Sequence, residues 1–446
     1  MRRANSWVPY APDATVPWDL RRVVHLHRRA GFAAPWDELQ RDLKAGPEES
    51  INRLLKGESF AHTPTDFAPT AAVLADVAAT SGDLNRLKAA WFYRMLYGPD
   101  PVGEKLALLW HDHFATGNAK VRNVNAMRRQ NELFREHARG KFSMLLNSVV
   151  RNPALLQYLD APANRKGHPN ENLARELMEL FTLGIGNYTE TDVKEAARCL
   201  TGWTVEEDKF IENPVRHDEG EKTLLGKTGK WSGTDLVNHL LEHPATSERL
   251  AAKLVKAFFG EKACPPDAVK ELANGLRERE LDLSWAMGTV LRSRLFFAEA
   301  NIRSRVSSPA EFVAGSVRAL GLFDPAPSTL ALADWSARMG EDLFDPPNVG
   351  GWPGGRVWVS SRALVARANY ASALVEGPNA GRADAYHPAE ASKAAGLGTS
   401  HSDVLTYHHR LLFGTDPSAE TTMRYAGLKD RQLVTALLSS PEAQLS

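Results

Sequence analysis

Apolar residues recur at helical spacing along most of this chain, and this periodicity restricts the possible folds more than any other feature. In residues 84–97, Leu84, Leu87, Trp91 and Met95 follow one another three or four positions apart, as the buried face of an α-helix requires. No series of segments alternates apolar and polar residues, which argues against a Rossmann sheet or a TIM barrel. The chain has 446 residues, 43% of them hydrophobic and 24% charged, and is long enough to bury a large core. We therefore predict a mainly α fold, a single globular domain of many helices.

The helical pattern is interrupted in two places, and these interruptions define the expected organisation. Residues 204–234 are rich in charge and glycine, which predicts a small β-hairpin or a long irregular loop inserted among the helices. Residues 377–400 are rich in Ala, Gly and Pro, which indicates a surface linker. We expect a main helical domain over residues 1–376 and a closing helical pair over residues 401–446 packed on it.

Charge, hydropathy and cysteine content argue against several classes of partner. Lys plus Arg and Asp plus Glu both number 54, so no net field draws the chain to nucleic acid. No apolar run approaches the roughly 20 residues of a membrane span. The first twenty residues contain an arginine pair but lack the apolar stretch of an export signal, which favours a cytoplasmic location for the chain as given. The two cysteines, Cys199 and Cys264, are too few for a disulfide framework. We expect free buried thiols, although two cysteines could in principle form one disulfide bond.

The most polar helix is predicted over residues 171–183. Glu171, Arg175 and Glu179 are spaced four apart and therefore share one face, and Glu176 lies beside them. One interpretation is a ladder of exposed ion pairs, each contributing about 0.3–0.5 kcal/mol. The other is a buried site in which the carboxylates bind a metal or act as general acid and base. Arg175 would then fix their geometry or bind an anionic substrate.

A second polar motif is Trp110-His111-Asp112-His113-Phe114. Within a helix the two imidazoles would point about 200° apart, so they converge on one ion only if the helix ends there. The alternative is a core His113 beside Phe114 and a surface His111. Two imidazoles with carboxylates of the 171–183 helix would suit zinc, iron or manganese. His168, just before that helix, is the candidate for a third imidazole ligand.

Local signals predict several turns and helix ends. Gly184 is expected to end the 171–183 helix, and Thr189 with Asp192 offers the capping groups that would begin the next one. The Gly226-Lys227-Thr228 sequence resembles the end of a phosphate-binding loop, but the preceding glycine is at the wrong distance and no apolar strand leads in, so we reject that function. Residues 350–355 are predicted to form tight turns between two tryptophans.

Several segments together resemble one bacterial family. They read HLHRRAGF, LLWHDHFATGN, NRKGHPNENLARELMELFTLGIGNYTETDVKEAARCLTGW, SPAEFVAGSVRALG, NVGGWPGGRVW and LLSSPEAQ. The chain is similar over nearly its whole length to the family catalogued as domain of unknown function 1800. The resemblance implies a single helical domain and brings no established activity. It also implies a frequent genomic neighbour, family 1501, which resembles the alkaline phosphatase and sulfatase superfamily. Many relatives begin with an export signal, which implies a periplasmic or envelope location as the alternative.

These observations lead to three hypotheses. The first is a metal-dependent enzyme, a hydrolase or an oxidoreductase, that binds a divalent transition metal. The second is a non-catalytic accessory or scaffold protein that acts with the family 1501 protein. The third is an ionic network that only fixes helix packing, formed by the charged residues of the 171–183 helix and Arg198. For the enzyme, the metal ligands would be His111, His113 and His168, and the catalytic residues would be Glu171, Arg175, Glu176 and Glu179.

Overall fold

The helices predicted from the apolar spacing form along most of the chain. The computed structural model describes residues 6–58, 60–260 and 263–446, so the arginine pair at the start of the chain lies outside the described residues. The described residues contain 23 α-helices. The first six are α1 (Leu20–Ala30), α2 (Trp36–Ala45), α3 (Pro47–Lys56), α4 (Phe67–Ser81), α5 (Leu84–Tyr97) and α6 (Pro101–His113).

The middle of the chain contributes ten further α-helices and the strands. Its helices are α7 (Asn118–Val121), α8 (Val124–Glu136), α9 (Phe142–Val149), α10 (Pro153–Tyr158), α11 (Asn172–Glu176), α12 (Glu190–Cys199), α13 (Gly233–Glu242), α14 (Pro244–Phe258), α15 (Pro266–Glu278) and α16 (Leu283–Leu291). Short 3₁₀ turns are η1 (Ala161–Ala163) and η3 (Pro214–Arg216), and η2 (Leu177–Thr182) is a π-helical turn that continues α11. The strands are β1 (Trp203–Glu206), β2 (Lys209–Glu212), β3 (Lys222–Leu224) and β4 (Lys227–Gly229).

The last third of the chain is again helical. It contains α17 (Pro309–Ala319), α18 (Thr329–Arg338), α19 (Ser361–Glu376), α20 (Pro388–Ala394), α21 (His401–Phe413), α22 (Ala419–Tyr425) and α23 (Asp430–Ser439), with 3₁₀ turns η4 (Gly355–Val359), η5 (Pro378–Ala380) and η6 (Pro441–Gln444). None of the helices described is both long and apolar enough to cross a membrane.

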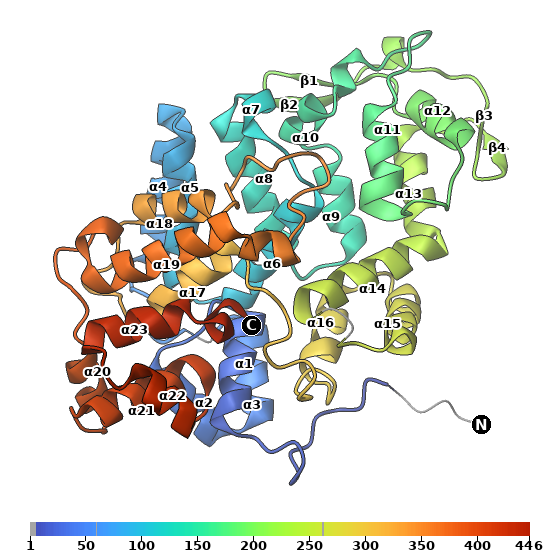
Figure 1. The fold of residues 1–446 in the computed structure, drawn as a ribbon. Coiled ribbons are helices and arrows are strands. Elements are labelled where there is room, and N and C mark those ends of the chain that lie inside the picture. Colours follow the sequence, from blue (N-terminus) through green and yellow to red (C-terminus); the bar gives the residue numbers. More distant parts are fainter. Residues whose placement is uncertain (1–5, 59, 261–262) are drawn as a thin grey trace, which may run out of the picture.

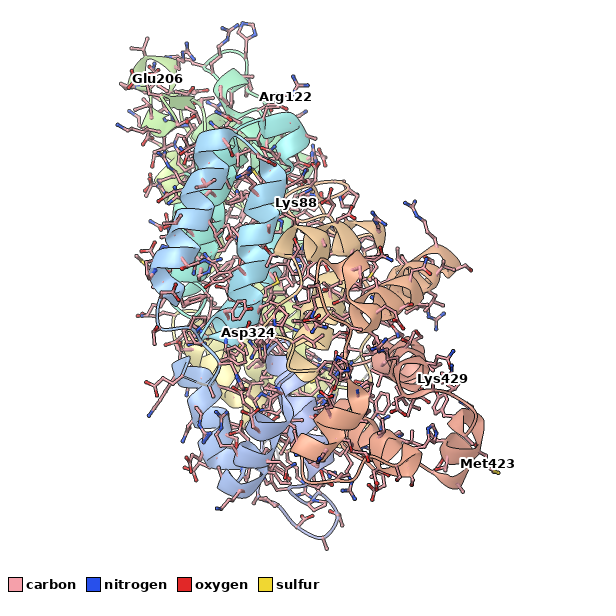
Figure 2. The ribbon with its side chains drawn as sticks, turned by 90° about the vertical axis from the view of Figure 1, so that its left-hand side faces the viewer. Lys88, Arg122, Glu206, Asp324, Met423 and Lys429 are labelled. Atoms are coloured by element: carbon pink, nitrogen blue, oxygen red, sulfur yellow. The ribbon has the colours of Figure 1, made fainter. Side chains whose placement is uncertain are left out.

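Segments far apart in the sequence lie side by side in the fold. Helices α1–α5 lie beside α17–α23, with α1 against α21 and α5 against α18, whereas α7–α16 and the hairpins form the other side of the molecule (Figure 1). Figure 2 shows Glu206 of the first hairpin and Met423 of α22 at opposite ends. One hydrophobic cluster runs through both sides, from Val23 in α1 to Leu437 in α23. The mainly α fold predicted from the sequence is confirmed.

The predicted insertion forms two small antiparallel hairpins. Strand β1 pairs with β2, and β3 pairs with β4. Leu225 and Gly226 both have positive φ between β3 and β4, as two-residue hairpin turns require. Lys227 and Thr228 therefore belong to a hairpin, in agreement with the rejection of a phosphate-binding loop.

The C-terminal region is more ordered than its composition suggests. The segment 377–400, predicted as a surface linker, contains η5 and α20 and buries Ala380, Tyr386 and Ser392. Three α-helices, α21–α23, stand where a closing pair was expected. Composition indicated a linker because Ala, Gly and Pro are frequent in flexible segments, but the small side chains here allow close packing on α21 and α23.

Candidate functional site

The C-terminal end of α6 connects three distant segments of the chain. The Phe344 backbone N–H donates to His111 Nε2 at 3.0 Å. The Trp352 backbone N–H donates to Asp112 Oδ1 at 2.9 Å, and Lys253 donates to Asp112 Oδ2 at 2.8 Å. His113 Nε2 donates to the Phe181 carbonyl oxygen at 3.3 Å. Three consecutive polar side chains thus fix the 342–358 loop, the π-turn η2 and helix α14 around one helix end.

Both histidines of this motif are neutral core residues. Burial lowers the pKa of His111 to about 4 and lowers the pKa of His113 well below its usual range. Their rings have different neighbours, because His111 packs on Trp91 and Phe344 whereas His113 packs on Phe142 and Phe181. A core His113 was one of the two predictions, but the surface position expected for His111 in that interpretation is wrong. The Phe344 segment, far away in the sequence, covers His111.

The glycine-rich segment approaches α6 closely at one glycine. Gly351 has φ +81°, and a Cβ there would lie 2.4 Å from Asp112 Oδ1. Trp352 then packs on His111 with a centroid distance of 5.4 Å. The loop between α18 and α19 extends in Figure 1 from these helices toward α7 and α8, where the Asn118 N–H donates to the Phe344 carbonyl at 2.8 Å.

The predicted polar helix carries a partly exposed ion-pair ladder. Arg175 contacts Glu171 at 2.9 Å and binds both carboxylate oxygens of Glu190 in α12 at 2.8 Å. These contacts raise the pKa of Arg175 and lower the pKa of Glu190. Arg198 belongs to a different ion-pair group with Glu195 and Asp218, so the single network considered above does not form.

Glu179 and Glu176 lie outside that ladder. Tyr188 donates its hydroxyl to Glu179 at 2.8 Å. Glu176 is half-buried and has neither a hydrogen bond nor an ion pair among the described residues. Burial and, secondly, the charge of Glu179 raise its pKa. Among the residues described, the Glu176 carboxyl therefore takes part in no contact that would give it a structural role.

Tyr158 lies near enough to Glu176 and to Asp345 to feel both charges, and neither Tyr158 nor Asp345 was a candidate in the sequence. Burial raises the pKa of the Tyr158 hydroxyl, and the charges of Asp345 and Glu176 raise it further. Asp345 accepts the Ala119 N–H at 3.2 Å. Gly117 lies between them, since a Cβ there would be 3.3 Å from the Tyr158 ring and 3.6 Å from Asp345 Oδ1. Of these two residues, only Asp345 could have been noticed in the sequence, because it lies shortly before the glycine-rich segment 350–355.

The backbone next to Glu176 departs from α-helical geometry. In η2, the Leu183 N–H donates to the Met178 carbonyl at 2.8 Å, one residue further back than in an α-helix. The widened turn leaves the Leu180 carbonyl to accept from Arg249 at 2.7 Å and the Phe181 carbonyl to accept from His113. Gly184 follows with φ +81°, as predicted for the end of this helix. π-turns of this kind occur frequently at functional sites.

The three candidate metal ligands are not brought together. His168 is exposed on a turn in which it pairs with Arg165, while His111 and His113 are buried in separate surroundings. Over residues 6–58, 60–260 and 263–446, no group of three or more His, Cys, Asp or Glu side chains could hold a metal ion. Cys199 is buried and Cys264 half-buried, and both thiols are free.

The fold and these contacts define a mainly α-helical protein in which the segments 110–118, 171–184 and 342–358 meet around one helix end. The chain belongs to the family described as protein of unknown function DUF1800, whose model matches residues 25–445. No curated protein and no solved structure matches the chain.

Proposed function

We propose that the protein is a hydrolase whose acid–base site is formed by Glu176, Tyr158 and Asp345. The observation that carries this proposal is the carboxyl group of Glu176, which is half-buried, has a raised pKa and has no partner among the residues described. A carboxyl group whose pKa is raised holds its proton to higher pH than an ordinary glutamate, which suits general acid catalysis. Perturbed titrating groups that occur together are typical of active sites.

In this proposal each of the three side chains has a different role in hydrolysis: general acid, general base and hydrogen-bond donor. Glu176 would donate its proton to the leaving group as the bond to that group breaks. The Asp345 carboxylate accepts a hydrogen bond from the Ala119 N–H. It would take the proton of the attacking water as the water oxygen bonds to the electrophilic atom of the substrate. The Tyr158 hydroxyl, which makes no hydrogen bond within the described chain, would donate to the developing negative charge on the substrate.

Isosteric variants test this assignment. Glu176→Gln should lower turnover of a responsive substrate, found with a panel of chromogenic esters, phosphate esters and glycosides, by about 10²–10⁴-fold. Glu171→Gln is the matched control, because Glu171 lies in the ladder with Arg175, and it should keep most of the activity. Full activity in Glu176→Gln would contradict the proposal. Carbon NMR of the Glu176 carboxyl should in addition give a pKa above the usual glutamate range, without any substrate.

The metal-dependent form of the enzyme hypothesis assigns His111, His113 and His168 as ligands. The separation of these side chains supports acid–base chemistry over that form. Elemental analysis of protein purified without chelators or a His tag distinguishes the metal-dependent mechanism from acid–base catalysis without a metal. A stoichiometric transition metal that is lost in His111→Gln would favour the metal-dependent form, whereas metal-free protein with unchanged melting in a chelator would count against it.

A surface near the 342–358 loop favours the accessory role as a second candidate. Val357, Leu364 and Val365 are exposed at η4 and the start of α19, together with Arg356 and Arg362, which form no ion pair within the part of the chain described. Apolar side chains flanked by unpaired cations suit an acidic protein partner, for which the family 1501 protein is the candidate. Co-purification that Val365→Glu abolishes and Glu176→Gln leaves intact would support this role, and no co-purification at any salt concentration would contradict it.

A further inference from the structure

Glu176 and Glu179 are two carboxyl groups of one helical segment that have different surroundings. They lie three residues apart across the junction of α11 and η2, and both are half-buried. Glu179 accepts the hydroxyl hydrogen of Tyr188 at 2.8 Å. Glu176 accepts no hydrogen bond and forms no ion pair among the residues described. A donor that stabilises the charged form is therefore present at one carboxyl group and absent at the other.

The chain brings Tyr188 back to Glu179 through a turn that contains two glycines. Gly184 has φ +81° and Gly186 has φ +91°, a region of backbone conformation that residues with a side chain rarely adopt. The chain reverses there and returns along η2 before Thr189 begins to cap α12. The hydrogen bond between Tyr188 and Glu179 thus joins a loop residue to the helical segment that the loop has just left.

Arg175 does not neutralise Glu176, although it precedes it in the helix. Its guanidinium contacts Glu171 at 2.9 Å and both carboxylate oxygens of Glu190 in α12 at 2.8 Å. Burial raises the pKa of Glu176 most, the charge of Glu179 raises it further, and the charge of Arg175 opposes these two effects only in part. The charge of Glu179 therefore acts on Glu176 without full compensation.

The groups that face the two carboxyls from neighbouring helices also differ. Arg249 of α14 donates to a carbonyl of η2 at 2.7 Å. Burial lowers the pKa of Arg249, and the charges of Glu179 and Tyr188 oppose this shift, so this guanidinium and the ionised Glu179 stabilise each other. From α10, the group that faces Glu176 is the hydroxyl of Tyr158, whose pKa is raised by burial first. A cation thus favours ionised Glu179, whereas a neutral group faces Glu176.

We propose that Glu179 is a positioning residue for Glu176, and that the Tyr188 hydroxyl holds Glu179 in its ionised form so that the proton of the pair resides on Glu176. Two neighbouring carboxylates repel each other, so the pair retains one proton to higher pH than a lone carboxyl group does. That proton resides on the group whose charged form has fewer stabilising contacts. The inference rests on the proposed function, in which Glu176 is the general acid, and adds the groups that keep this acid protonated.

NMR titration of the glutamate carboxyl carbons tests the position of the proton without any substrate. In the wild-type chain, Glu176 should lose its proton at higher pH than Glu179. Glu179→Gln removes the neighbouring charge and should lower the pKa of Glu176 by roughly 1 pH unit. Tyr188→Phe removes the donor, and should raise the pKa of Glu179 and bring the two values closer together. Tyr425→Phe is the matched control, because this half-buried tyrosine lies in α22, far from α11 (Figure 1), and it should change neither value.

The pH profile of activity gives a second measurement. The high-pH limb of kcat/KM, set by loss of the Glu176 proton, should move to lower pH in Glu179→Gln, so that activity above this limb falls about 10-fold, with a smaller effect at lower pH. Circular dichroism should show unchanged helical content in all variants. A proton that resides on Glu179, or a Glu176 pKa that is the same with and without the Glu179 charge, would overturn the inference. If the inference fails in this way while Glu176→Gln is inactive, the proposed function stands. If Glu176→Gln is fully active, the proposed function fails, and the titration still decides which carboxyl group holds the proton.

Discussion

At the scale of single residues, Gly351 is the position where the glycine-rich segment depends most on having no side chain. Its φ of +81° disfavours other residues, and a Cβ would lie 2.4 Å from Asp112 Oδ1 and 2.6 Å from the Asp112 carbonyl oxygen. We predict that Gly351→Ala lowers the free energy of unfolding by about 2–4 kcal/mol. Urea unfolding measures the change. Gly427→Ala is the control because its Cβ would meet nothing within 4 Å, and equal midpoints for the two variants would disprove the prediction.

His111 should make stability depend on pH. Its folded-state pKa of about 4 lies below the roughly 6.5 of an unfolded histidine, so the unfolded chain takes up a proton first as the pH falls. The stabilisation from neutral His111 is complete above pH ~6.5 and is lost progressively toward pH ~4, by up to about 3 kcal/mol. Buried His113 acts in the same direction.

The variant His111→Gln isolates this effect, because glutamine can accept the Phe344 N–H but does not titrate. We expect the variant to be less stable than the wild-type chain at pH 8 and to lose less stability between pH 7 and pH 5, as measured by urea unfolding at each pH. Parallel pH profiles for the two proteins would show that the titration of His111 does not contribute.

At the scale of elements, the sequence predicted those features that short stretches of chain determine. Thr189 and Asp192 form the expected capping box at the start of α12, and Gly184 ends the preceding helix. The π-turn η2 was missed because one extra residue in a turn hardly alters the apolar spacing. Glu176 was a candidate because its helix is polar, but its neighbours Tyr158 and Asp345 come from segments whose approach is decided by tertiary packing.

Thr189 also gives a prediction at this scale. Its hydroxyl accepts the Asp192 N–H at 3.2 Å, and Asp192 in turn accepts the Thr189 N–H at 2.8 Å. Thr189→Ala should therefore lower the free energy of unfolding by about 1 kcal/mol, and Thr189→Ser should restore most of it. A calorimetric melting temperature measures both changes, and an unchanged melting temperature in Thr189→Ala would refute the role of the cap.

At the scale of the whole molecule, the last residues tie the two ends of the chain together. Arg28 of α1 donates to the Ala443 carbonyl at 2.7 Å, and the buried Arg29 donates to the Ser446 carbonyl. Arg367 of α19 donates to Gln444 Oε1 at 3.1 Å. Three guanidinium groups from two helices that are far apart in the sequence thus share acceptors in one short segment.

Removing residues 440–446 should take one acceptor from each of these guanidinium groups, together with the packing of η6, and lower the free energy of unfolding by about 3–5 kcal/mol. Because α1 and α21–α23 share one hydrophobic cluster, the loss should lower a single cooperative transition without separating the unfolding of residues 401–446 from that of the rest. Calorimetry combined with urea unfolding followed by two spectroscopic probes tests both expectations. Glu442→Ala, an exposed substitution within the same segment, should leave the melting temperature nearly unchanged. Two separate transitions in the wild-type chain would instead mean that the C-terminal helices form a unit with its own stability.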